Sequence, residues 1–177
     1  IKSIIYPLPV ATHYNLEPLP LKKQILVYAP DKEDYYWKRF NGELIKRIVN
    51  EFPNVSFIIL KNSGKKFSEP NVKCFTWVKD MKKMYKNSLG MIRISEHDGF
   101  PGTIVETLSM GRYFVYSQEF PFCKKATNFD ELKKSIKEII NESKLNVSGR
   151  EYVEKEYGLD SIAEGLIKIY KQYKLIK

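Results

Sequence analysis

Residues 93–112 of this chain read RISEHDGFPGTIVETLSMGR. They begin at the end of an apolar run, residues 89–94, that is typical of a buried strand, and they continue through a turn rich in glycine and proline. A short helix is predicted next, ending at Gly111, and a further apolar run follows at residues 113–117. A strand, a tight turn and a helix N-terminus predict an anion site, because the free N–H groups of the first helical turn point outward and the helix dipole favours negative charge.

Two acidic residues flank this turn. Asp98 and Glu106 are separated by seven residues. A purely structural alternative is that Thr103 and Glu106 form a capping box, in which Glu106 only satisfies the start of the helix. Glu96 lies in the same turn and is an alternative to Asp98 as the functional acidic residue. The turn therefore predicts either a ligand site with acidic residues on both sides or a capped helix start.

The pattern Asp98-Gly99-Phe100-Pro101, followed by Ile104-Val105-Glu106-Thr107-Leu108 and Gly111, resembles the acidic signature of retaining sugar-nucleotide glycosyltransferases, the glycogen-synthase-like enzymes of the GT-B fold. The resemblance is specific over residues 98–111 and diffuse over the rest of residues 24–170. It implies that Asp98 contacts the donor sugar and that Glu106 holds the nucleotide ribose. The usual first acid is Glu, so Asp98 reaches one methylene less far. It further implies that the turn and the helix start lie against the sugar and phosphate of the donor, through Gly99, Phe100, Pro101, Gly102 and Thr103.

Strands and helices alternate along the chain from Gln24 onward. The predicted strands are residues 25–29, 55–60, 72–75, 89–94 and 113–117. The predicted helices are residues 33–51, residues 79–87, a short helix that ends at Gly111, a helix that starts at Asn128 or Asp130 and runs through Ile140, residues 147–157 and residues 159–173. The last has a stripe of Ile162, Leu166, Ile169 and Tyr173 that is expected to pack on the core. The alternative is partial exposure, because the terminal helix of the family packs back towards the other half of the enzyme. This alternation predicts an α/β fold with a Rossmann-like parallel sheet and helices on both faces, which the resemblance identifies as one half of a GT-B fold.

In such a sheet, ligands bind at the carboxyl ends of the strands. The turns at residues 61–64, 76–78 and 98–106 are therefore expected around one crevice. By the resemblance, the nucleobase is expected in the vicinity of four residues, Lys61, Thr76, Trp77 and Val78. An alternative for Trp77 is a place in the core.

The family carries an Arg and a Lys just after the first strand of this domain, where they hold the diphosphate. No Gly-Arg pair follows residues 25–29 here. Lys38 and Arg39 are the nearest basic candidates, with ordinary exposed helix charges as the alternative. Arg93, at the end of a strand beside the motif, is a further candidate for the phosphate. The family needs no divalent metal, this chain has no Asp-x-Asp motif, and we expect neither a metal nor a cofactor.

Composition and charge narrow the class of protein. The chain has 177 residues, 43% of them hydrophobic, and a formal net charge of +9. Its lysines are spread over nearly the whole sequence without an Arg-rich block, which favours a lysine-rich surface over nucleic-acid binding. Weak peripheral contact with an anionic membrane is the second choice.

Cys74 and Cys123 stand far apart without metal spacing, so we expect free thiols in the cytoplasm or at the inner face of a membrane, and a disulfide stays open.

The resulting hypothesis is a donor-binding domain, residues 24–177, which residues 1–23 link to an acceptor-binding N-terminal domain that is absent here. We expect it to bind a nucleotide-diphosphate sugar for retaining transfer of a hexosyl group to an acceptor hydroxyl, and to be inactive alone. Two alternatives remain: a sugar-nucleotide epimerase of the same fold, and a non-enzymatic basic α/β module that binds polyanions.

Overall fold

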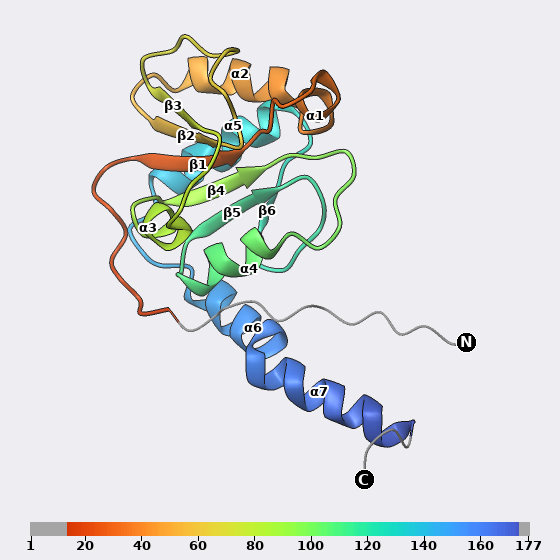
Figure 1. Ribbon diagram of the computed structural model, residues 1–177. Coiled ribbons are helices and arrows are strands. Elements are labelled where there is room, and N and C mark those ends of the chain that lie inside the picture. Colours follow the sequence, from red (N-terminus) through yellow and green to blue (C-terminus); the bar gives the residue numbers. More distant parts are fainter. Residues whose placement is uncertain (1–13, 174–177) are drawn as a thin grey trace.

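The computed structural model describes residues 14–173, and Figure 1 shows their arrangement. A parallel six-stranded sheet lies between two sets of helices. The strands are β1 (Gln24–Tyr28), β2 (Ser56–Leu60), β3 (Val72–Phe75), β4 (Gly90–Arg93), β5 (Tyr113–Tyr116) and β6 (Lys124–Lys125). The helices are α1 (Asp34–Arg39), α2 (Gly42–Glu51), α3 (Met81–Lys86), α4 (Gly102–Ser109), α5 (Phe129–Ile140), α6 (Val147–Tyr157) and α7 (Leu159–Gln172). The predicted Rossmann-like α/β fold is confirmed.

The strand order across the sheet is β3-β2-β1-β4-β5-β6, and every neighbouring pair is parallel. The chain runs outward from β1 to β3, crosses back to place β4 beside β1, and continues outward to β6. The connections therefore diverge between β1 and β4, and this is the point at which parallel sheets of this kind bind ligands. The turns after β1, β2, β3 and β4 all open on that edge.

The side chains of β1 enter two hydrophobic cores in alternation. Ile25 and Val27 pack in the core that α2 and α5 cover, and Leu26 packs in the core that α3, α4 and α6 cover. All three are fully buried. A strand that is buried on both faces is a continuous apolar run, and this is why the central strands are readily predicted from the sequence.

The single helix predicted for residues 33–51 is wrong, because the chain forms two helices there, α1 and α2. Asn41 lies between them with φ 50, in the left-handed region that asparagine tolerates. A Cβ atom on Gly42 would lie 2.1 Å from the ring of Trp37, so a glycine is required there. The indole of Trp37 covers the start of α2 and donates a hydrogen bond of 2.8 Å to Glu43.

The segment that leads into β1 lies on the domain from residue 14 onward. The fully buried Arg112 donates to the carbonyl oxygens of Glu17 and Pro18 at 3.0 and 3.1 Å, and to carbonyl oxygens in the last turn of α3. The predicted linker, residues 1–23, thus falls partly outside the described residues, and its second half is tied to the domain.

Helix α7 leads away from the sheet (Figure 1). Ile162 is its one buried residue, whereas Leu159, Ile167 and Tyr170 are exposed. Within the stripe, Ile162 is buried, Leu166 and Ile169 are half-buried and Tyr173 is exposed. Full core packing of the stripe is therefore wrong and partial exposure is confirmed, because no layer of the described residues extends far enough to cover the end of the helix.

Candidate functional site

The turn between β4 and α4 is fixed by an ion pair. The guanidinium group of Arg93 donates to both carboxylate oxygens of Asp98, with Nη2 to Oδ1 at 2.9 Å. Both side chains are largely buried, at 12% and 8% exposure. The guanidinium carbon of Arg93 also lies 4.1 Å from the ring centroid of Tyr28 and 5.2 Å from that of Phe40. Asp98 therefore faces the interior of the turn and anchors it to the end of β4.

Helix α1 holds the same turn from the other side. Arg39 donates two hydrogen bonds, of 3.0 and 2.7 Å, to the carbonyl oxygen of His97. The backbone N–H of Glu96 donates to the carbonyl of Arg39 at 3.0 Å. Lys38, the other predicted phosphate ligand of α1, is exposed. The two basic residues of α1 thus differ, because Arg39 is engaged with the protein and Lys38 extends into solvent.

Glu106 faces helix α3. Its carboxylate accepts a hydrogen bond of 2.5 Å from the hydroxyl of Tyr85, which is almost completely buried. Burial, and next the negative charge of Glu106, raise the pKa of Tyr85, so this hydroxyl keeps its proton and donates. The capping-box alternative is wrong, because Pro101 precedes α4 without a side-chain cap. The hydroxyl oxygen of Thr103 is buried and has no hydrogen-bond partner among residues 14–173.

A cavity of about 170 Å³ joins Glu106 to the turns after β2 and β3. It is largely apolar and is lined by Tyr28, Leu60, Lys61, Phe75, Thr76, Trp77, Val78, Met81, Tyr85, Thr103 and Glu106. All four residues predicted near a nucleobase are therefore brought together with Glu106 and Thr103. Trp77 is 71% exposed, so the alternative that it lies in the core is wrong. The amine of Lys61 lies 4.4 Å from the centroid of the Trp77 ring.

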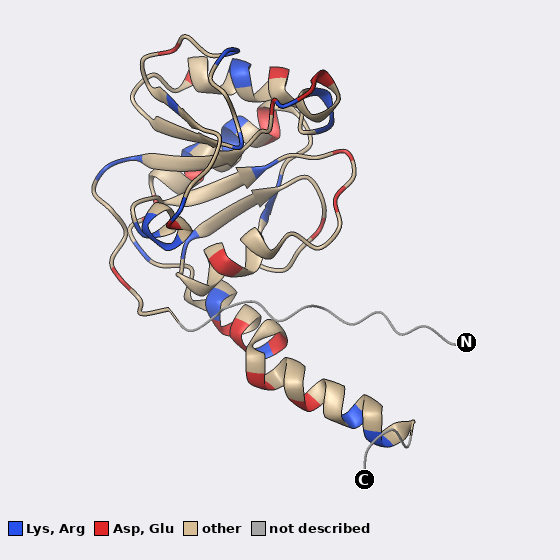
Figure 2. Cartoon of the chain, viewed as in Figure 1, with Lys and Arg blue, Asp and Glu red and all other residues tan. Residues whose placement is uncertain are grey.

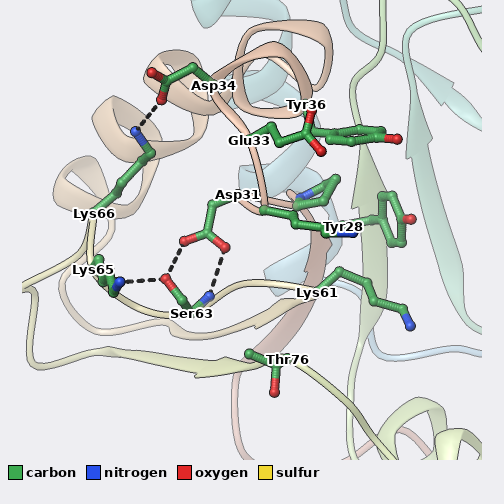
Figure 3. A pocket seen from close by; sticks show the side chains of 12 residues that line it. Tyr28, Asp31, Glu33, Asp34, Tyr36, Lys61, Ser63, Lys65, Lys66 and Thr76 are labelled. Atoms are coloured by element: carbon green, nitrogen blue, oxygen red, sulfur yellow. Dashed lines mark hydrogen bonds and ion pairs between the residues drawn. The ribbon is translucent and has the colours of Figure 1, made fainter.

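A larger open cavity of about 1030 Å³ adjoins the first, and Tyr28, Lys61 and Thr76 line both. Figure 3 shows the side chains that line it, which come from the end of β1, the start of α1 and the turns after β1, β2 and β3. Asp31 accepts hydrogen bonds from the backbone N–H and the hydroxyl of Ser63, at 2.8 and 2.6 Å. The turns after β1 and β2 are therefore tied together across the floor of this cavity.

The remaining predicted residues line neither cavity. They are Lys38, Arg39, Arg93, Asp98, Gly99, Phe100, Pro101 and Gly102. Phe100 is 43% exposed and stacks on Tyr157 of α6, with ring centroids 4.9 Å apart. The structure thus gathers Thr103, Glu106 and the second and third turns at one cavity, and places the Asp98 turn next to it.

Sequence reasoning missed Tyr85 and Tyr28 as site residues. Tyr28 is the last residue of β1, so its place at the carboxyl edge follows from the predicted topology. Tyr85 lies on the short helix before β4, and only its position in that helix, one turn after Met81, indicates the face that it shares with the cavity. Neither signal distinguishes a binding residue from a core aromatic in the sequence alone.

Residues 14–173 contain neither a metal-binding cluster nor a membrane-spanning helix. No group of three or more His, Cys, Asp or Glu side chains there is placed to hold a metal ion. No helix in that range is both long and apolar enough to cross a membrane.

Three tyrosines with raised pKa values predict a loss of stability at high pH. Burial, followed by the charge of Asp98, raises the pKa of Tyr116 to about 12, and burial raises those of Tyr113 and Tyr157 to about 12. The unfolded chain releases these protons near pH 10 and the folded chain does not, so stability is complete below pH 10 and falls as the pH rises toward 12. Ultraviolet titration of the 12 tyrosines should show a group that stays protonated at pH 11. A single ionisation step near pH 10 in the folded protein would contradict this.

No protein-family model and no curated protein matches the sequence, whereas solved structures share the fold. TarM of S. aureus, solved as a mutant in complex with fondaparinux, alpha-GlcNAc-glycerol and UDP, has a TM-score of 0.73 and 15% identity over 91% of this chain and 38% of that chain. The lipopolysaccharide outer core galactosyltransferase WaaB has a TM-score of 0.70 and 16% identity over 96% of this chain and 56% of that chain.

The pneumococcal O-GlcNAc transferase GtfA, in complex with UDP and GlcNAc, has a TM-score of 0.59 and 12% identity over 87% of this chain and 36% of that chain. This chain thus spans between about a third and somewhat more than half of the length of these proteins. It has a Rossmann-like α/β fold that matches part of the fold of GT-B glycosyltransferases.

Proposed function

We propose that this chain is the donor-binding domain of a retaining glycosyltransferase and that it binds a nucleotide-diphosphate sugar. The observation that carries the proposal is the cavity that unites Glu106 with Lys61, Thr76, Trp77 and Val78 at the carboxyl edge of the sheet. Its apolar walls suit a nucleobase, and it holds one carboxylate that can accept hydrogen bonds from ribose hydroxyls.

Each part of the site then has a role. The base lies against Trp77, and the ribose hydroxyls donate to the carboxylate of Glu106, which Tyr85 orients. Thr103 and the backbone amides at the start of α4 face the phosphates and the donor sugar. Asp98, in its ion pair with Arg93, positions the turn that carries these amides. No metal ion is part of this proposal.

The proposed reaction is transfer of a hexosyl group with retention of configuration to an acceptor hydroxyl. This domain would hold the donor and stabilise the departing diphosphate with N–H groups and a cation. Acceptor binding would come from another domain, so we expect this chain alone to bind nucleotide without transferring sugar. An epimerase would isomerise the sugar nucleotide without an acceptor, and we expect no such isomerisation.

The charge distribution favours this proposal over a general polyanion-binding module. Figure 2 shows basic residues spread over helices and loops, interspersed with acidic ones. Several lysines pair with acids, as Lys86 does with Glu17 and Lys124 with Glu138, both at 2.6 Å. We propose a reducing compartment such as the cytoplasm, because Cys74 and Cys123 are both free thiols.

Replacing Glu106 with glutamine tests the proposal. Glutamine keeps an acceptor for Tyr85, so the fold should survive, and it loses the charge that strengthens hydrogen bonds from the ribose. Calorimetric titration with UDP, GDP and ADP should show saturable binding of one of them, weakened by about tenfold or more in Glu106→Gln. UDP is the first choice, because the TarM and GtfA structures hold it.

The control is Glu164→Gln. Glu164 is exposed on α7 and lines neither cavity, so its loss of charge should leave the affinity unchanged. Equal weakening by both variants would indicate a general charge effect and argue against a ribose site at Glu106. Failure of all three nucleotides to bind the folded wild-type chain would refute the proposed function.

A further inference from the structure

The proposed donor brings a diphosphate, and most cations near the site are already engaged with protein groups. Arg93 is paired with Asp98, and Arg39 donates to the carbonyl of His97. Lys66 pairs with Asp34 at 3.2 Å. The turn after β1 itself carries mostly acidic side chains, as Figure 3 shows. Lys32 is the one lysine of that turn, and it lines the larger cavity alone. A cation placed between the two cavities must therefore come from another element of the site.

Lys61 differs from the other lysines that line the larger cavity. It also lines the smaller cavity that contains Glu106, whereas Lys32 and Lys65 line the larger one alone. In Figure 3 its side chain extends away from the Asp31–Ser63 pair. Its amine lies over the ring of Trp77, 4.4 Å from the centroid, and no ion pair holds it among the described residues.

The backbone of Lys61 is held in an unusual conformation. Its φ of 59 lies in the left-handed region, which is unfavourable for a residue with a Cβ atom. Hydrogen bonds on both sides fix it: the N–H of Asp31 donates to the Lys61 carbonyl at 3.4 Å, and the N–H of Asn62 donates to Phe75 at 3.1 Å. The buried amide of Asn62 also donates to the carbonyl of Ala29 at 2.7 Å.

Such backbone strain persists only where the surrounding structure imposes it, and it occurs often at binding sites. Glycine would adopt this φ without cost. The turn after β2 instead carries a lysine whose side chain it directs toward the junction of the two cavities.

We propose that Lys61 is the residue that binds the diphosphate group of the nucleotide, a role that rests on the proposed function. Its ammonium stands between the cavity for the nucleoside and the larger one, into which the diphosphate would extend. A lysine ammonium is a compact charge on a flexible stem and serves well as a phosphate ligand. The cation for the diphosphate thus comes from the turn after β2 and not from the turn after β1.

The test is the Lys61→Gly variant beside Lys65→Ala. Glycine removes the side chain and relieves the backbone strain, so the melting temperature should not fall. Calorimetry with UDP, GDP and ADP should show the dissociation constant of the bound diphosphate rising about tenfold to a hundredfold. The affinity for the corresponding nucleoside should stay within about twofold of wild type, and Lys65→Ala should change neither value by more than about twofold.

Added salt provides a second readout. Raising the ionic strength should weaken diphosphate binding more in the wild type than in Lys61→Gly, because an attraction between charges is screened. Unchanged diphosphate affinity in Lys61→Gly would overturn the inference while the proposed function stands. Equal loss of nucleoside and diphosphate affinity would also overturn it, since Lys61 would then act at the base or the ribose. A wild-type chain that binds no nucleotide would refute both.

Discussion

The Arg112→Ala variant is expected to lose about 3–5 kcal/mol of unfolding free energy, which is a large part of the stability of a domain of this size. The guanidinium group is fully buried and donates to four carbonyl oxygens, those of Glu17, Pro18, Tyr85 and Lys86, at 3.0 to 3.3 Å. Alanine leaves these oxygens without donors and creates a cavity, and both effects destabilise the fold. Urea unfolding monitored by circular dichroism measures the loss.

The control for this prediction is Arg150→Ala. Arg150 donates to one carbonyl, that of Tyr14 at 2.8 Å, and pairs with Glu154 on the surface of the same helix. We expect a loss of about 1 kcal/mol. If the two variants unfolded at the same urea concentration, Arg112 would not connect the entering segment to α3 in the way described.

The second large effect is expected for Asp98→Ala. This change leaves the guanidinium group of Arg93 buried without its partner, and removal of one member of a buried pair costs about 3–5 kcal/mol. The cost should appear as a lower urea midpoint. Nucleotide affinity should also fall, because the turn ahead of α4 loses its anchor at the end of β4.

A double variant separates the ion pair from its neighbours. In Arg93→Met with Asp98→Ala, the methionine keeps an apolar stem against the rings of Tyr28 and Phe40, and no buried charge remains. We expect this variant to recover most of the lost stability. A double variant that is as unstable as the sum of the two single variants would show that the two side chains are not coupled.

The central strands could be predicted because their physical signal is strong. Each is buried on both faces, so the segments that form β1, β2 and β4 are apolar runs between turns. The break between α1 and α2 could not be predicted from spacing. Apolar residues continue at helical intervals across Asn41, whereas in the structure Asn41 adopts the left-handed conformation and Gly42 leaves room for the indole of Trp37.

The convergence of the site could be predicted from topology. Parallel strands end at one edge, so Lys61, Trp77 and Glu106 were expected together, and one cavity joins them. The direction of individual side chains could not be predicted. Asp98 and Glu106 flank one turn in the sequence, and in the structure Asp98 faces Arg93 and Glu106 faces Tyr85.

The most direct test of the account is a nuclear magnetic resonance titration that follows the two indole N–H signals of the chain. Trp77 is exposed at the proposed base site, whereas Trp37 is 4% exposed and donates its indole N–H to Glu43. UDP is added first, followed by GDP and ADP. For the nucleotide that binds, the account predicts that the chemical shift of the Trp77 indole N–H changes until binding is saturated, while that of Trp37 stays constant. A Trp77 signal that stays fixed while a nucleotide binds would contradict the claim that this cavity holds the base.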